Sequence, residues 1–249
     1  MATAWLKKSA ALVFMASALF SAAAGSQDKD KAKEKDSSPG AQTVAPPDSS
    51  TEGTVTIGGQ AVAYRAVAGT ITVGSTEAQD ATLAANGSIL PDSGVKTPND
   101  PSEAPATARM FYVAYFKKDA VPSHRPVMFL YNGGPGSATM WLHLGTFGPR
   151  RVVVPDTKHQ AAAPYTVVEN QYSLLDVCDL VFIDAPGTGL SRTFGKEKAK
   201  AFYGIDADAH AFARFIHRFL SKYDRWNSPK YLFGESYGTP RSAVLAADL

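Results

Sequence analysis

The sequence predicts an α/β protein with a doubly wound, mostly parallel central sheet and antiparallel strands at its N-terminal side. Continuous apolar runs at Val127–Tyr131 and 180–183 are typical of strands buried on both faces, as parallel strands are. Between the second run and another short run at 230–233, apolar residues recur at helical spacing over residues 206–223. A strand–helix–strand order of this kind predicts a right-handed crossover between parallel strands.

Length and charge narrow the possibilities further. The 249 residues, 45% of them hydrophobic, suffice for a sizeable core in one or two domains. Lys7 and Lys8 account for the net charge of +2, and no basic stripe is interleaved with aromatic residues, so we expect no nucleic-acid partner. The single cysteine, Cys178, lies in an apolar context, and we interpret it as a buried packing residue.

Residues 1–24 have the pattern of a secretory signal peptide. Two lysines precede an apolar stretch at 10–20 that is too short to span a membrane, and three alanines at 22–24 supply a cleavage site. We therefore expect an exported protein, periplasmic or secreted, with no stable membrane association after cleavage. Residues 25–53 lack apolar periodicity and are rich in Asp, Lys, Ser and Pro, which predicts a disordered linker.

The folded domain is expected over residues 54–249 and to begin with antiparallel strands. Residues 54–57 and 60–67 flank Gly58-Gly59, which is typical of a hairpin, and residues 70–73 predict another strand. The polar, proline-punctuated residues 75–108 predict a long insertion loop that is partly mobile. An alternating pattern at residues 109–116 predicts the next strand.

A glycine-rich turn, Asn132-Gly133-Gly134-Pro135-Gly136-Ser137, follows the buried strand Val127–Tyr131 and precedes an expected helix at 138–147. Three interpretations remain open for it. A phosphate-binding loop is disfavoured because no lysine follows, whereas a plain tight turn and an oxyanion hole both fit.

The pentapeptide Gly234-Glu235-Ser236-Tyr237-Gly238 lies between the strand at 230–233 and an expected helix at 242–249. This is the context of a nucleophile elbow, in which small residues two before and two after the serine allow a sharp turn. A chance G-x-S-x-G in a glycine-rich loop is the alternative. The strand and helix on either side favour the elbow, with Ser236 as the nucleophile.

All five histidines precede Ser236 in the chain. His210 and His217 lie seven residues apart on the helix that Asp206 is expected to cap, and no acid completes a zinc-binding spacing. We therefore expect no metal and no cofactor.

Together with Gly148-Pro149 and the segment 184–191 (DAPGTGLS), these motifs resemble the serine carboxypeptidase family of the α/β-hydrolase fold, over residues 109–249. The resemblance implies a substrate with a free C-terminus, either peptide or protein, and an acyl-enzyme on Ser236. It also implies an oxyanion hole from the N–H groups of Gly134 and Tyr237, and substrate binding through Asn132, Gly133 and Glu235.

The sequence departs from the family pattern in three places. Leu130 replaces a tryptophan and Thr146 replaces a second glutamate, which weakens the expected carboxylate clamp and the acidic optimum. The Asp and His of the triad follow the serine in this fold, but no histidine follows Ser236, and Asp248, twelve residues on, is expected to be a surface residue. We therefore expect the N-terminal part of a longer enzyme, inactive alone. An esterase or acyltransferase, or a non-catalytic peptide-binding protein, are the alternatives.

Overall fold

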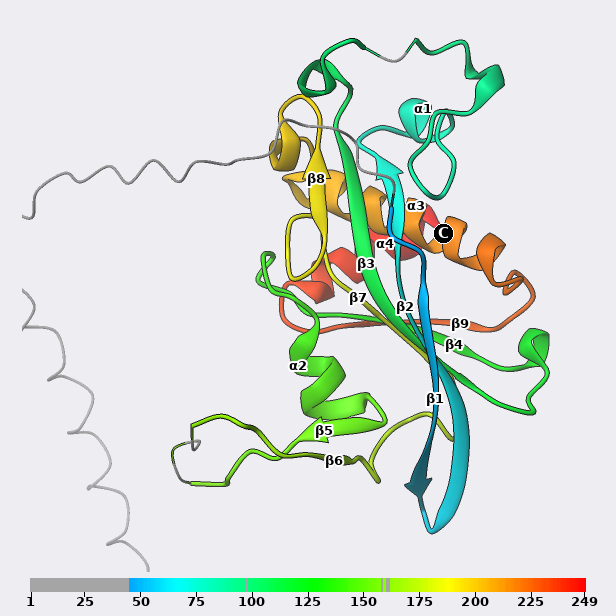
Figure 1. Cartoon of the computed structure of the whole chain (residues 1–249), viewed down its shortest axis with the longest axis vertical. Coiled ribbons are helices and arrows are strands. Elements are labelled where there is room, and N and C mark those ends of the chain that lie inside the picture. Colours follow the sequence, from blue (N-terminus) through cyan, green and yellow to red (C-terminus); the bar gives the residue numbers. More distant parts are fainter. Residues whose placement is uncertain (1–44, 97, 158, 160–161) are drawn as a thin grey trace, which may run out of the picture. The chain divides into compact units, whose positions relative to one another are not determined.

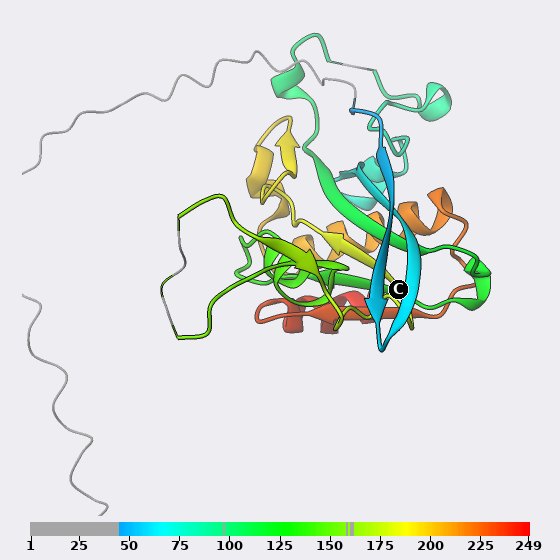
Figure 2. The same cartoon turned by 60° about the horizontal axis from the view of Figure 1, so that its bottom comes forward.

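The computed structural model describes residues 45–96, 98–157, 159 and 162–249. The expected signal peptide, residues 1–24, lies outside the described residues, and so do residues 25–44 of the expected linker. Within the described part, the chain forms a mixed β-sheet with helices on both faces (Figures 1 and 2).

The central sheet is antiparallel at its N-terminal side and parallel where β7, β4 and β9 meet. In spatial order its strands are β1 (Ser49–Ile57), β2 (Gln60–Gly74), β3 (Thr107–Lys117), β7 (Asp179–Ile183), β4 (Val127–Tyr131) and β9 (Lys230–Gly234). A short strand, β8 (Arg192–Phe194), pairs with the start of β3, and β5 (Arg150–Val152) pairs with β6 (Val167–Glu169) as a separate ribbon. Parallel pairing brings the carboxyl ends of β4 and β9 to one edge, with Tyr131 opposite Gly234.

The helices differ greatly in length. The longer ones are α3 (Ile205–Lys222) and α4 (Gly238–Asp248), and the shorter ones are α1 (Glu77–Asp80), α2 (Met140–Leu142) and the π-helix that continues it (His143–Phe147). Single 3₁₀ turns occupy Pro91–Ser93, Pro101–Glu103 and Pro122–His124, and a longer one spans Lys198–Phe202.

The core has two layers, one on each face of the sheet. On one face Phe212, Phe215 and Phe219 of α3 are fully buried against β3, β4 and β7. On the other face Leu142 of α2 and Cys178 pack against β4 and β7. Cys178 is a free, buried thiol, as expected, and burial raises its pKa to about 11.

A buried ion-pair network lies at the other end of the sheet, where β4 and β7 begin. Asp179 accepts from Nε of Arg125 at 2.7 Å and from Nη1 of Arg225 at 2.6 Å. Nη2 of Arg225 also donates to the carbonyl of Arg125 at 2.9 Å. The network joins the start of β7 to the chain segments that lead into β4 and β9.

Several N-terminal predictions need correction. β1 begins at Ser49, so residues 49–53 are not a disordered linker; their backbone pairs with β2 from Ser49–Ala68 onward, which composition alone cannot reveal. β2 is one continuous strand, not two, and the insertion 75–108 contains short helices and ends where β3 starts at Thr107. The predicted Gly58-Gly59 hairpin is confirmed by the pairing of Ile57 with Gln60.

The helix predictions were right in place but wrong in extent. The expected helix at 138–147 is a three-residue α2 followed by a π-helix. Gly204, not Asp206, is the N-cap of α3, and Asp206 lies in its first turn. The helix after Ser236 begins at Gly238 instead of residue 242, since the turn residues themselves enter it.

Candidate active site

Ser236 lies in a sharp turn between β9 and α4, and its backbone has a φ of +56°. Left-handed backbone is uncommon for a residue with a side chain, and it turns exposed Ser236 away from the strand. The turn leaves no space at Gly234, where a Cβ would lie 2.8 Å from the Cα of Gly238. The strand–turn–helix geometry expected for a nucleophile elbow is present.

The glycine-rich turn after β4 packs directly against this elbow. A Cβ on buried Gly133 would overlap the amide nitrogen of Tyr237 and would lie 2.6 Å from the carbonyl oxygen of Glu235. Gly134 follows with a φ of +109°, a conformation that glycine adopts without steric cost, and it is exposed. Both loops leave the same edge of the sheet because β4 and β9 are parallel neighbours. The two amides expected to form an oxyanion hole therefore belong to contacting segments.

The three residues expected to bind a substrate carboxylate are joined by hydrogen bonds. Nδ2 of Asn132 donates to Oε2 of Glu235 at 3.0 Å, and the N–H of Gly133 donates to the same oxygen at 3.4 Å. Oδ1 of Asn132 accepts from the amide of Leu142 in α2 at 3.2 Å. Asn132 is buried whereas Glu235 is exposed, so the group presents a carboxyl at the surface beside Ser236.

The segment 184–191 is hydrogen-bonded to the residues that follow the glycine-rich turn. Asp184 accepts from the amide of Thr139 at 2.8 Å and from the amide of Leu190 at 3.0 Å, so one carboxylate ties two loops together. A Cβ on Gly189 would lie 2.6 Å from the Cγ of Asp184, which explains a glycine there. Ser191 in turn donates to the carbonyl of Asp184 and accepts from the amide of Phe111 in β3. The family resemblance includes this segment, but its sequence pattern alone does not indicate this structural role.

A buried arginine beneath the elbow was missed entirely. Arg241, in the second turn of α4, is fully buried and donates to both carboxylate oxygens of Asp208 in α3, at 2.6 and 3.1 Å. Its third nitrogen donates to the backbone carbonyl of Asn132 at 2.9 Å. Two features of the sequence could have indicated this ion pair. One is an arginine five residues after the elbow serine, and the other is an aspartate on the apolar side of a helix.

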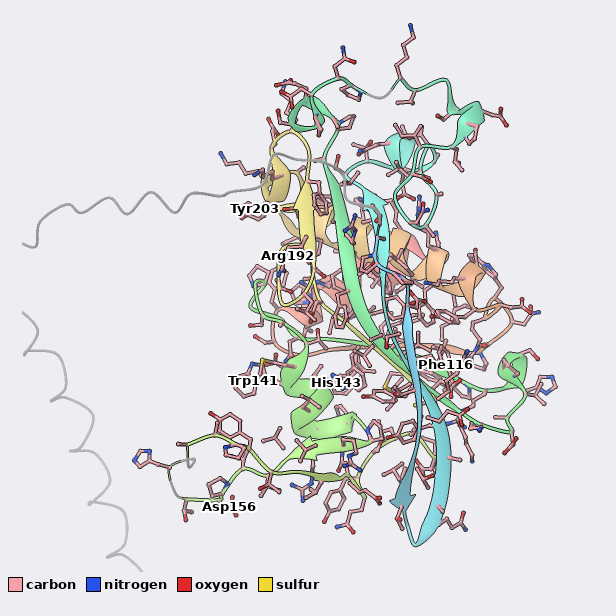
Figure 3. All side chains as sticks on the ribbon, in the orientation of Figure 1. Phe116, Trp141, His143, Asp156, Arg192 and Tyr203 are labelled. Carbon is pink, nitrogen blue, oxygen red and sulfur yellow. The ribbon has the colours of Figure 1, made fainter. Side chains whose placement is uncertain are left out.

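Two of the described histidines, His143 and His210, have side-chain contacts away from the elbow. His143 turns toward the sheet, where its Nε2 lies 2.7 Å from the hydroxyl of Tyr115 and its ring stacks on Phe182, whereas Trp141 points outward (Figure 3). Burial lowers the pKa of His143 to about 4. His210 pairs at 2.7 Å with Asp248, at the far end of α4 and about 15 Å along the helix from the elbow.

Neither a cluster of metal ligands nor a membrane-spanning helix is found among the described residues. In the part of the chain that the structure describes, no three His, Cys, Asp or Glu side chains come together as metal ligands would. Over the same residues, none of the helices has the length and apolar character needed to cross a membrane.

A serine on a strand–turn–helix elbow, packed against a glycine-rich turn, is the arrangement typical of α/β serine hydrolases. The model of the serine carboxypeptidase family matches residues 101–247, more than half of the chain. The protein belongs to this family, as the motifs predicted.

Two curated proteins of Arabidopsis thaliana are similar to this chain. Serine carboxypeptidase-like 33 is 28% identical over 147 residues, which cover 56% of this chain and 28% of that protein. Serine carboxypeptidase-like 34 is 27% identical over 135 residues, which cover 52% of this chain and 25% of that protein. The chain thus spans about a quarter of the length of the curated relatives it matches.

Proposed function

We propose that this protein is, or is part of, a serine-type carboxypeptidase of the α/β-hydrolase fold that forms an acyl-enzyme on Ser236. The observation that carries the proposal is the contact between the two loops: Gly133 lies against the backbone of Tyr237, next to a serine held at positive φ. Peptidase chemistry is also the activity for which the family is named.

In the proposed reaction, Oγ of Ser236 attacks the carbonyl carbon of the scissile bond while a general base takes its proton. The N–H groups of Gly134 and Tyr237 stabilise the negative oxygen that develops, and this kind of stabilisation is worth about 10²–10³ in rate per donor. The leaving amine takes the proton from the protonated base, and water then hydrolyses the ester on Ser236.

The substrate we propose is a peptide or protein with a free C-terminus. Asn132, Gly133 and Glu235 already share one hydrogen-bonded group, and we propose that this group receives the terminal carboxylate. Thr146, where the family pattern has a second glutamate, is exposed and donates to the carbonyl of Trp141. One acidic member of the clamp is therefore missing, and this favours an esterase or acyltransferase as the second candidate.

In the described part of the chain, no histidine is hydrogen-bonded to Ser236 as a general base would be. His143 is held by Tyr115 and Phe182, and His210 by Asp248, so neither is placed to accept the proton of Ser236. We propose that polypeptide other than the described part provides the histidine and its acidic partner. Without them only a small fraction of the rate would remain, from the oxyanion hole and binding.

Export belongs to the same proposal. The lysines, apolar stretch and alanines of residues 1–24 support a cleaved signal, and hence a periplasmic or secreted enzyme. Sequencing the N-terminus of the mature protein tests this: a start near residue 25 supports export, whereas retention of Met1 contradicts it.

The test of the proposed chemistry is labelling by a fluorophosphonate, located by mass spectrometry. The full-length gene product should be modified at Ser236, the 249-residue chain should react far more slowly, and Ser236→Ala should not react. Absence of labelling in the full-length protein would leave a peptide-binding role as the better account. Rapid labelling of the 249-residue chain would contradict the proposed external base.

A further inference from the structure

We infer that Arg241 and Asp208 form a buried positioning pair that holds the backbone of the two proposed oxyanion-hole donors, Gly134 and Tyr237, in place. This inference rests on the proposed function. Neither side chain touches the surface at which substrate would bind, since Arg241 is fully buried and Asp208 is buried. The role is therefore exerted through the backbone that they hold.

The pair connects three elements at one point. Arg241 lies on α4, five residues after Ser236, and Asp208 lies near the start of α3. Two of the guanidinium nitrogens donate to Asp208 in a fork, at 2.6 and 3.1 Å, and the third donates to the carbonyl of Asn132, at the end of β4, at 2.9 Å. The planar shape of arginine suits two partners in different directions, which a lysine ammonium serves less well.

The carbonyl of Asn132 matters because it belongs to the peptide unit that opens the glycine-rich turn. Its other end is the N–H of Gly133, which donates to Glu235 at 3.4 Å. Fixing both ends of one peptide plane sets the direction in which the chain enters Gly134, the proposed oxyanion donor. Gly133 and Gly134 lack side chains that could do this by packing, and Arg241 supplies one of the restraints on the peptide that precedes them.

The same guanidinium contacts the second proposed donor residue. It lies 5.4 Å from the centre of the Tyr237 ring and 4.5 Å from that of Phe212 in α3. Arg241 therefore reaches one partner on each side of the oxyanion hole: the peptide before Gly133 and the side chain of Tyr237. A shift of either N–H by about 1 Å can cost up to about 10²-fold in rate.

The chain offers a matched control in Arg225. It is also buried and also paired with a single aspartate, Asp179, but at the opposite end of the parallel strands. Replacing either arginine by lysine disturbs a buried ion pair and should lower the melting temperature. Only Arg241→Lys should in addition disturb the glycine-rich turn.

The experiment measures two properties of the full-length protein and its variants: the fluorophosphonate reaction rate per folded molecule, and hydrogen exchange of the amides in residues 132–138. Arg241→Lys should slow the reaction between about tenfold and hundredfold and speed the exchange. Arg225→Lys should leave both within about twofold. Asp208→Asn, which keeps one acceptor oxygen, should be intermediate and provides a variant if Arg241→Lys fails to fold.

Wild-type rate and exchange in Arg241→Lys, or equal losses in Arg225→Lys, would overturn the positioning role. If the wild-type protein itself is not labelled at Ser236, the proposed function fails instead. The exchange measurement then still decides whether Arg241 holds the turn, because exchange does not require catalysis.

Discussion

At the scale of single residues, the site depends on where side chains are absent. Gly133 and Gly234 each lie where a Cβ would overlap backbone of the other loop or of the same turn. Gly136, in the same glycine-rich turn, has open space around its Cβ position and is not at positive φ. Glycines that look alike in the sequence therefore differ in what they contribute.

This difference predicts opposite results for two alanine substitutions. Gly133→Ala must push the turn away from Tyr237, so we expect at least a hundredfold loss of fluorophosphonate reactivity, in line with the loss of an oxyanion donor. Gly136→Ala should react within about threefold of wild type. Both rates are measured on the full-length protein under one set of conditions. Equal reactivity of the two variants would contradict the packing of the turn against the elbow.

The partly buried ring of His143 predicts a loss of stability in acid. Its folded pKa is about 4, below the usual 6.5, so between these values the unfolded chain binds a proton that the folded chain does not. The stability present above pH 6.5 should therefore fall as the pH drops toward 4, by up to roughly 3 kcal/mol from this residue.

Urea unfolding at several pH values measures this effect. His143→Gln should flatten the pH dependence, even though it lowers stability at neutral pH, whereas a substitution of the exposed His124 to Gln should leave the dependence in place. An unchanged slope in His143→Gln would show that other groups cause the acid sensitivity.

At the scale of elements, α3 carries the larger part of the core on its face of the sheet. Phe219 packs against the rings of Tyr112, Phe129 and Tyr223, with centroids 4.6–5.5 Å apart. The helix also presents Asp208 to Arg241, so the packing that holds α3 also supports the site.

Truncating this contact gives a prediction for the helix. Phe219→Ala leaves a cavity between α3 and the sheet and should cost about 3–5 kcal/mol of unfolding free energy. His217→Ala, on the exposed side of the same helix, should cost about 0.5 kcal/mol or less. Chemical denaturation of both variants tests the comparison, and similar costs would contradict the assigned face of α3.

Elements with a strong local pattern could be predicted from the sequence, and those set by distant contacts could not. The strand Val127–Tyr131 is predicted to the residue, because five consecutive apolar side chains followed by Asn132 and two glycines leave little choice. Residues 49–53 have no such pattern and become strand only through pairing with β2. The same holds for the site: Ser236 has a motif, whereas Arg241 is identified only by its partners Asp208 and Asn132.

At the scale of the whole molecule, the order of the strands in the sheet could not be predicted from the sequence. β7 lies between β3 and β4, although it follows both in the chain, because each crossover can pack on either face of the sheet. That order places the turn after β4 beside the elbow after β9. It also places Asp184, directly after β7, where it accepts a hydrogen bond from Thr139, just after the first of these turns. Three motifs far apart in sequence thus meet at one edge.

The most direct measurement for this arrangement is release of the C-terminal residue from an N-blocked peptide by the full-length protein. Such peptides should be hydrolysed, Ser236→Ala should abolish hydrolysis, and the same peptide with a C-terminal amide should react far more slowly because it lacks the carboxylate proposed to bind Asn132, Gly133 and Glu235. Hydrolysis of the free and amidated peptides at equal rates, or persistence of activity in Ser236→Ala, would contradict a carboxypeptidase acting through this serine.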